Sequence, residues 1–383
     1  MKLKKLIFSR AVLLFLLAAT MVFSFFGGYI GIASSKADNL LPSEEVGGFD
    51  FQTDTLEVAA STKDISYKDL KLIPGGIAFG VKFQTEGIMV VGFDDVETSS
   101  GKTNPAFDAG IREKDVIIKL DGKELRSAAE LTEAVETCEG RALTLTYTRN
   151  GKEYTAKLTP RFSDSDGKYK TGLWVRDSGA GIGTVTYIDP QTLTFGGLGH
   201  GICDSETGGI IPLNRGTVMD VTIGGVQKGA VGAPGEIKGY FSSSKTGTLY
   251  SNTYCGVFGL FGELPKNLPS GAIPIGTRSE IKDGDAYIWC TLDESGPQRY
   301  SIKISEINRS ANGNKCFTVT VNDKKLIEKT GGIVQGMSGS PIIQNGKLVG
   351  AVTHVLINDP TSGYGIFIEN MLNMAQMPMA KAS

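Results

Sequence analysis

The pattern of hydrophobic and polar positions divides the chain into four segments of different character. Ala11 to Ile32 runs without a charged residue, which is long enough to span a bilayer. Residues 38–71 are polar and have neither helical nor strand periodicity, which is typical of a linker. Residues 72–160 contain short alternating stretches around one helical stretch. Residues 161–383 follow, with many short apolar runs and little helix signal from Leu173 to Ile368.

The first 37 residues predict export. Basic residues at the start, Met1-Lys-Leu-Lys-Lys5, keep the N-terminus inside and direct the following chain outside. The small residues Ser35 and Ala37 fit a signal-peptidase cleavage site. Both a cleaved signal peptide and an uncleaved membrane anchor fit residues 1–37, and the length of the apolar run favours the anchor. We expect the flexible linker, residues 38–71, to follow it.

The pattern of residues 72–160 predicts a small module of strands and one helix. Ser127–Cys138 has helical spacing, and it begins with a serine followed three residues later by a glutamate, the capping-box arrangement. Leu143–Tyr147 and Tyr154–Leu158 alternate and are joined through Arg149-Asn150-Gly151, which indicates a hairpin.

Beyond residue 160 the chain predicts an all-β domain. Short strand-like runs are separated by turn residues such as Asn312-Gly313 and Asn345-Gly346. Many short strands at this spacing indicate a sandwich or a barrel. The runs that carry this prediction are Gly183–Tyr187, Ala286–Cys290, Tyr300–Ile304 and Cys316–Val321.

Composition narrows the class of function. The net charge of −2 over 383 residues gives no bulk attraction for nucleic acid. The five cysteines form no CxxC pair and there are only two histidines, so we expect no metal site and no cofactor. An odd number of cysteines in an exported protein leaves at least one thiol unpaired.

Two stretches within residues 73–158 resemble a PDZ domain. The second and more specific one, Asn104–Ile111 followed by Lys114–Ile118 and Asp121-Gly122, is similar to the "PA..AGL..GD.I..ING" run of bacterial PDZ modules, with Lys114 where a glycine is usual. The first is a glycine-rich loop whose N–H groups can hold a terminal carboxylate, while the strand after it accepts a peptide. The alternative is a small β domain whose glycines serve turns only. The resemblance implies a peptide-binding loop of Gly75, Gly76, Ile77, Ala78, Phe79 and Gly80.

The stretch Gly331–Pro341 carries the strongest chemical signal. A serine nucleophile needs a base for its proton and donors for the oxyanion. Glycines around Ser338 allow a tight turn that directs the N–H groups of Gly336 and Ser338 toward one point. The stretch and the hairpin after it resemble the nucleophile region of trypsin-like proteases, "GxSGGP", with Ser340 in place of the second glycine. This register favours Ser338 over Ser340 as the nucleophile.

Only two histidines can serve as the base. His200 has glycines on both sides, which let the backbone approach its neighbours and expose the ring. His354 follows the nucleophile, on a strand that lines the substrate pocket in the trypsin-like layout. We therefore expect His200 to be the general base.

The third member of a catalytic triad is less well defined. In the trypsin-like order His, Asp, Ser, the aspartate lies between the other two. Asp323 fits this order, although it stands only fifteen residues before Ser338. Asp220, Asp285 and Asp293 fit the order as well. Asp323 is the favoured candidate.

The whole arrangement resembles the stage IV sporulation protein B family, peptidase family S55. The motifs are "GLWVRDSGAGIGTVTYIDP", "FGGLGHGICD" and "TGGIVQGMSGSPIIQNGKLVGAVTHV". The resemblance implies an exported serine endopeptidase of sporulation in the space between forespore and mother cell. It implies self-cleavage and cutting of a membrane-complex partner that inhibits an intramembrane protease, which matures a late sigma factor. The family's serine, histidine and aspartate match Ser338, His200 and Asp323.

Two other functions remain open at this point. A catalytically silent PDZ scaffold would bind membrane partners without cutting them. A constitutive quality-control protease of the envelope would share the chemistry but accept more substrates. The fold expected in each case is mainly β, a PDZ domain (72–160) followed by a trypsin-like double β-barrel (161–383). The expected partners are peptide or protein substrates and the chain's own linker, with the membrane reached through the N-terminal segment.

Overall fold

The computed structural model describes residues 69–375, and the predictions made for residues 1–37 and for nearly all of the linker lie outside them. Within the described range no helix is long and apolar enough to cross a membrane. The helices of this range are α2 (Pro105–Asp108), α3 (Ala128–Glu136), α4 (Lys324–Thr330) and α5 (Ile368–Ala375). The strands are β1 (Lys71–Pro74), β2 (Ala78–Phe93), β3 (Val96–Thr98), β4 (Gly101–Thr103), β5 (Val116–Leu120), β6 (Lys123–Glu124), β7 (Leu143–Arg149), β8 (Lys152–Leu158), β9 (Arg161–Ser163), β10 (Lys168–Lys170), β11 (Leu173–Ile188), β12 (Thr194–Gly197), β13 (Leu213–Gln227), β14 (Glu236–Thr253), β15 (Gly256–Phe261), β16 (Ile273–Pro274), β17 (Gly284–Thr291), β18 (Pro297–Ser305), β19 (Phe317–Val321), β20 (Pro341–Gln344), β21 (Lys347–Leu356) and β22 (Asp359–Phe367).

The C-terminal strands close a barrel in the order β17-β18-β19-β22-β21-β20. β18 shows why these residues form barrel strands, because Tyr300, Ile302 and Ile304 are buried while their neighbours face out. Together with residues such as Ile342 and Val352 they fill one hydrophobic core. We call this the second barrel.

The N-terminal strands close another ring. β11 pairs with β12, β12 with β15, β15 with β14, β14 with β13, β13 with β2, and β2 returns to β11. Phe79, Val81 and Phe83 of β2 alternate into its core and meet Val185 and Phe195. This is the first barrel. The expected mainly β fold with two barrels is therefore confirmed.

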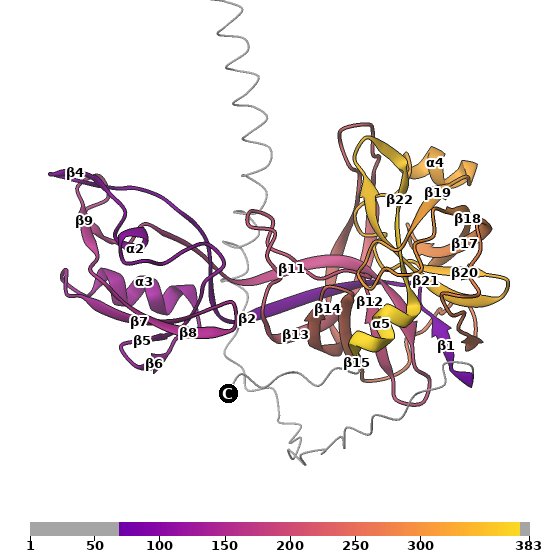
Figure 1. Ribbon diagram of the computed structural model, residues 1–383, viewed down its shortest axis with the longest axis horizontal. Helices are drawn as coiled ribbons and strands as arrows, with labels where there is room; N and C mark the ends of the chain where they lie inside the picture. Colours follow the sequence, from indigo (N-terminus) through magenta and orange to yellow (C-terminus); the bar gives the residue numbers. More distant parts are fainter. Residues whose placement is uncertain (1–68, 376–383) are drawn as a thin grey trace, which may run out of the picture. The chain divides into compact units, whose positions relative to one another are not determined.

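Two long strands, β2 and β11, run between the first barrel and a smaller module (Figure 1). Residues 78–84 of β2 pair with residues 178–184 of β11 in the barrel, and residues 89–93 pair with 173–176 beyond it. The smaller module therefore lies between two barrel strands in the sequence. From the sequence we expected a PDZ domain over residues 72–160, followed by the protease domain over residues 161–383. In the structure, residues 78–84 of β2, which precede the smaller module, belong to the first barrel. A strand with alternating apolar residues looks the same in either module, so the pattern alone did not separate them.

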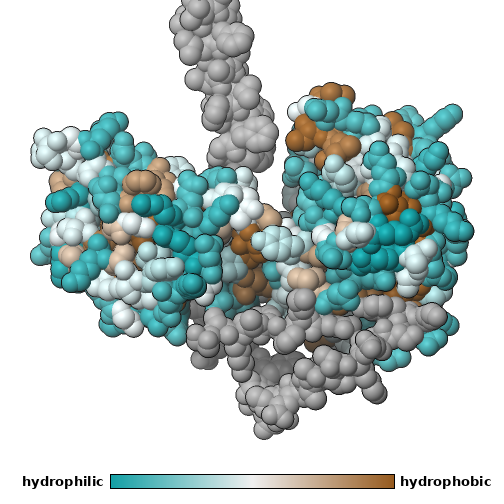
Figure 2. Space-filling model, in the orientation of Figure 1, coloured by the Kyte–Doolittle hydropathy of each residue, from teal (hydrophilic) through white to brown (hydrophobic). Residues whose placement is uncertain are grey.

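The smaller module has a core of its own around α3. Ile88, Ile117, Leu131 and Leu145 are among its buried residues. The capping predicted for its helix is present, since the Glu130 amide donates to the Ser127 hydroxyl at 3.2 Å. The predicted hairpin joins β7 and β8. In the space-filling view, hydrophilic residues cover most of the visible surface and hydrophobic surface is confined to small patches (Figure 2).

Candidate active site

The turn that carries Ser338 lies between α4 and β20 and is fastened to both barrels. The Thr184 amide of β11 donates to the Ser338 carbonyl at 3.0 Å, and the Gly339 amide donates to the Val352 carbonyl of β21 at 2.8 Å. Gly339 has φ +94°, and a Cβ atom at this position would lie 2.0 Å from the Thr184 carbonyl oxygen. Only glycine fits such a position. The glycine after the nucleophile therefore allows the turn to sit directly against the first barrel.

The two serines of the motif differ in accessibility. Ser340 is fully buried, and its hydroxyl donates to the Met337 carbonyl at 2.6 Å. Ser338 is partly exposed, and its hydroxyl donates to the Thr353 carbonyl of β21 at 2.6 Å. A nucleophile must be reached by substrate, so this geometry favours Ser338.

The backbone around Ser338 leaves two donors for an oxyanion. The amides of Gln335, Met337 and Gly339 donate to carbonyl groups within the protein. In residues 69–375, the amides of Gly336 and Ser338 have no such acceptor. These are the two amides that the sequence predicts as oxyanion donors, and that role stays a prediction.

A hairpin of the first barrel holds the turn from the other side. In the loop between β13 and β14, the Gly229 amide donates to the Thr330 carbonyl at 2.8 Å. Gln335 is held at both backbone groups, because its amide donates to the Gly235 carbonyl at 2.8 Å and its carbonyl accepts from the Ile237 amide at 2.9 Å. Sequence reasoning missed this support. The signal for it was the run of glycines at 229, 232 and 235, spaced by three.

His200 follows β12 and is oriented by its own backbone. Its Nδ1 lies 2.8 Å from the Gly201 carbonyl. Because a carbonyl oxygen only accepts, Nδ1 carries the proton and Nε2 of the neutral ring is left without one. Burial lowers the pKa of His200 below its ordinary value, so the ring is neutral at neutral pH.

His354 lies against His200. The two ring centroids are 4.8 Å apart and the rings are tilted by 35°. Its Nδ1 atom is buried without a hydrogen-bond partner in the described chain. Burial, followed by the charges of His200 and Lys315, lowers the pKa of His354 to about 4. The structure thus brings Ser338 and His200 to adjacent residues of β21, Thr353 and His354.

Asp323 is not brought to His200. It is the N-cap of α4, where one carboxylate oxygen accepts from the amides of Lys325 at 3.0 Å and Leu326 at 3.1 Å. The other oxygen accepts from the Ser301 amide at 3.2 Å. A triad role for Asp323 stays a prediction that this geometry does not support.

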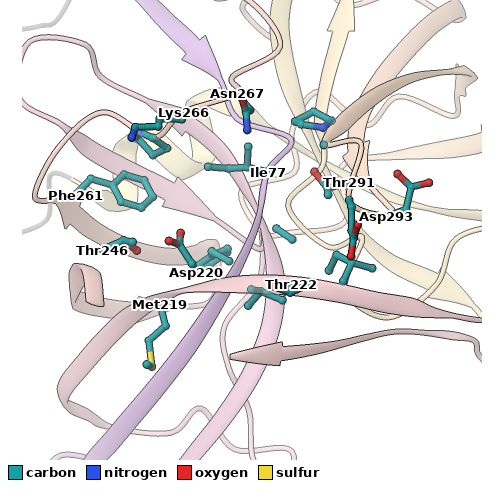
Figure 3. Close-up of a pocket in the computed structure, with 18 of the residues that line it drawn as sticks. Ile77, Met219, Asp220, Thr222, Thr246, Phe261, Lys266, Asn267, Thr291 and Asp293 are labelled. Atoms are coloured by element: carbon teal, nitrogen blue, oxygen red, sulfur yellow. The ribbon is translucent and has the colours of Figure 1, made fainter. Parts of the chain in front are cut away.

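The alternative aspartates do not replace it. Asp220 and Asp293 line a cavity of about 580 Å³ whose lining includes neither Ser338 nor His200 (Figure 3). Asp285 is exposed on β17. Within residues 69–375 no carboxylate forms a hydrogen bond or ion pair with His200. The assembled groups are a serine and a histidine without an acidic partner.

The glycine-rich loop expected to bind peptides lies in the first barrel. The Gly75 amide donates to the Thr186 carbonyl at 3.0 Å, and the Gly76 amide donates to the Val185 carbonyl at 2.8 Å. Residues 80–84 of β2 pair with β11 on one edge and with β13 on the other. Amides and edges that are already paired cannot hold a carboxylate or an added strand. The role expected for Gly75, Gly76, Ile77, Ala78, Phe79 and Gly80 therefore does not agree with this structure, in which the two glycine amides are bonded to β11 and residues 78–80 belong to barrel strand β2.

The cysteines form neither disulfides nor a metal-binding group in the described residues. All five are free thiols. In the described range, no group of three or more His, Cys, Asp or Glu side chains is arranged to hold a metal ion.

Two protein-family models match this chain. A family model described as SpoIVB peptidase S55 matches residues 167–372, just over half of the chain. A PDZ domain model matches residues 75–159. The PDZ match includes the glycine-rich loop and the part of β2 that belongs to the first barrel.

Several solved structures match parts of this chain. The PDZ domain of the SdrC-like protein from Listeria monocytogenes is 21% identical over 24% of this chain and 87% of that chain, with a TM-score of 0.20. The inactive form of the Rv3671c protease from M. tuberculosis is 17% identical over 50% of this chain and 81% of that chain, with a TM-score of 0.28. The HtrA-type protease AlgW with a tripeptide is 14% identical over 51% of this chain and 55% of that chain, with a TM-score of 0.31. TM-scores this low add nothing to the fold seen directly.

Proposed function

Because this chain belongs to the SpoIVB peptidase S55 family, and is thus a PDZ-containing serine protease of sporulation, we propose that Ser338 is its nucleophile and His200 its general base. One observation carries this assignment. The Ser338 hydroxyl and the His200 ring meet adjacent residues of β21, while the neighbouring backbone offers two free amides.

The proposed reaction follows from these positions. The Ser338 hydroxyl leaves the Thr353 carbonyl, and its oxygen attacks the carbonyl carbon of the scissile peptide bond as His200 Nε2 takes the proton. The amides of Gly336 and Ser338 donate to the resulting oxyanion. His200 then gives the proton to the leaving amine. In the second half of the reaction His200 takes a proton from water, the water oxygen attacks the acyl carbon, and the proton returns to the Ser338 oxygen as the acyl group leaves. The Nδ1–H group of His200 keeps its hydrogen bond to the Gly201 carbonyl throughout.

The biological role is proposed from the family. The enzyme is exported, tethered by or released from residues 1–37, and acts in the space between forespore and mother cell. It cuts itself and a membrane-bound regulator of an intramembrane protease, and so triggers late sigma-factor activation. Support comes from the basic residues before the apolar run, Ala11 to Ile32, and from a peptide-binding class of module next to the protease.

A catalytically silent scaffold is the second candidate. The observation in its favour is that no acidic residue in the described range forms a hydrogen bond or ion pair with His200, while the Ser338 hydroxyl is hydrogen-bonded to the Thr353 carbonyl. A fluorophosphonate probe separates the two functions, because it labels only an activated serine. We expect the wild-type full chain to be labelled, and Ser338→Ala and His200→Ala not to be. An unlabelled wild-type protein that is folded by circular dichroism would favour the scaffold.

A further inference from the structure

The rings of the two histidines lie against each other in a tilted arrangement. Their centroids are 4.8 Å apart and their planes are inclined by 35°, which is closer to parallel than to an edge-to-face contact. His354 is placed there by β21, one residue after Thr353, whose carbonyl accepts the Ser338 hydroxyl. His354 thus touches the base while its strand neighbour touches the nucleophile.

The nitrogen chemistry of His354 is unused in this arrangement. Nδ1 is buried, and no hydrogen-bond partner for it exists in the described part of the chain. An unpaired polar atom in such a place opposes folding. A phenyl ring would fill the same space without that disadvantage, so a nitrogen that served packing alone would have no advantage here. What the ring offers its neighbour is an aromatic face.

His200 lacks the usual means of orientation. Its Nδ1–H reaches the Gly201 carbonyl, a neutral group on the next residue, in place of a carboxylate. During the reaction His200 becomes a cation, and an aromatic face against a cation is stabilising. A neutral ring provides this, whereas a charged one would repel.

We infer that His354 is a positioning residue of the protease reaction: its neutral ring face holds the His200 imidazole in place and stabilises the imidazolium that forms when Ser338 loses its proton. This rests on the proposed Ser338–His200 pair. The titratable groups that act on His354 are His200 and Lys315, and the Lys315 ammonium lies 5.1 Å from the Tyr364 ring centroid. Both neighbours and the burial oppose a proton on His354, so the ring is neutral when the enzyme works.

The test compares His354→Phe, which keeps a ring face, with His354→Ala, which removes it. The full-length proteins are reacted with a fluorophosphonate probe, and the maximal labelling rate is separated from the probe concentration at half-maximal rate. We expect His354→Phe to label within about threefold of wild type, and His354→Ala to lose about tenfold or more in the maximal rate with little change in half-maximal concentration. Circular dichroism establishes that each variant is folded, and His354→Phe serves as the folded reference if the alanine variant is not.

Three outcomes overturn the inference. If His354→Phe is as slow as an inactive variant, the nitrogen atoms matter and the ring face is not the reason. If His354→Ala labels like wild type, the residue has no role in positioning. If only the half-maximal concentration changes, His354 lines the substrate pocket instead. His200→Ala, measured in parallel, tests the proposed function separately: full labelling of that variant would remove the base assignment itself, whatever His354 does.

Discussion

The Ser338 hydroxyl donates to the Thr353 carbonyl at 2.6 Å, so the proposed nucleophile is hydrogen-bonded to β21 and not to His200. A change in the Ser338 side-chain torsion is therefore the first step toward attack. Such a rotation between staggered positions is small compared with a rearrangement of the loop. The backbone bonds of the turn, from Thr184 to Ser338 and from Gly339 to Val352, do not need to change.

Ser338→Ala should abolish proteolysis, while Ser340→Ala should leave most of it. Loss of the nucleophile removes the covalent step and costs on the order of 10⁴ to 10⁶ in rate. Ser340 donates only to the Met337 carbonyl, so its loss should lower the free energy of unfolding by about 1 kcal/mol. Probe labelling and thermal unfolding of the two variants measure these effects. Strong labelling of the Ser338→Ala protein would transfer the role to Ser340.

Asp323 can be tested by two substitutions that differ in capping ability. Asparagine can cap α4 almost as well as aspartate, whereas alanine leaves the Lys325 and Leu326 amides unpaired. The structure predicts that Asp323→Asn keeps its labelling rate, and that Asp323→Ala loses about 1 kcal/mol of stability. If Asp323→Asn is folded but loses labelling by orders of magnitude, the carboxylate belongs to the catalytic group, as the family resemblance implies.

The sequence was sufficient for local features that have a local cause. The Ser127 cap, the β7–β8 hairpin and the buried alternation of β18 each depend on residues close together in the chain. The glycine spacing of the Ser338 turn could be recognised locally, although the neighbour that requires a glycine at position 339 is Thr184 of β11, far away in the sequence.

Features that depend on distant pairing were not predictable. Gly75 and Gly76 form a loop with the right composition for binding a carboxylate, but strand β11, a hundred residues later, supplies their hydrogen-bond acceptors. Likewise, Asp323 has the right order for a triad, although one of its oxygens accepts from amides of the helix that follows it and the other from the Ser301 amide of β18. The contact between His200 and His354 is also invisible in a sequence that separates them by more than 150 residues. In each case the sequence shows which residue types are present, but tertiary structure determines which groups they contact.

Gly339→Ala should inactivate the enzyme, and Gly346→Ala is its matched control. Both glycines have positive φ, +94° and +75°, but only at Gly339 would a Cβ atom meet backbone, 2.0 Å from the Thr184 oxygen. At Gly346 nothing lies within 4 Å. We expect the control to lose about 1 kcal/mol of stability from backbone strain. Displacing Ser338 by about 1 Å in Gly339→Ala should cost about 100-fold or more in labelling rate. Equal labelling of the two variants would mean that the turn is not held against β11.

Stability should depend on pH through the two histidines. Burial lowers the pKa of His200, and burial with the charges of His200 and Lys315 lowers that of His354 to about 4. In the unfolded chain both have a pKa near about 6.5. Between these values the unfolded chain binds protons that the folded chain does not, so the free energy of unfolding is complete above pH ~6.5 and falls as the pH decreases toward ~4.

Thermal unfolding between pH 7.5 and 4.5 measures this effect, with His354→Phe as the control. Phenylalanine cannot be protonated and leaves no buried nitrogen without a partner. The variant should therefore have a higher Tm at acid pH and a shallower decline. If wild type and variant decline in parallel, His354 is protonated equally in both states.

The last prediction concerns self-cleavage within residues 38–71. This segment has no periodicity in sequence, and an extended conformation is what a protease cleft accepts. It joins the apolar segment to the folded part, so one cut there converts a tethered enzyme into a diffusible one. Ser338→Ala should keep the segment intact, and Ser340→Ala, whose buried hydroxyl is not expected to act in catalysis, should still be cut. N-terminal sequencing and intact mass of the wild type and both variants measure the site. Signal peptidase acting after Ala37 is the competing source of a cut, and it does not depend on Ser338. The same mature N-terminus in Ser338→Ala and wild type would therefore assign the cut to signal peptidase and exclude self-cleavage.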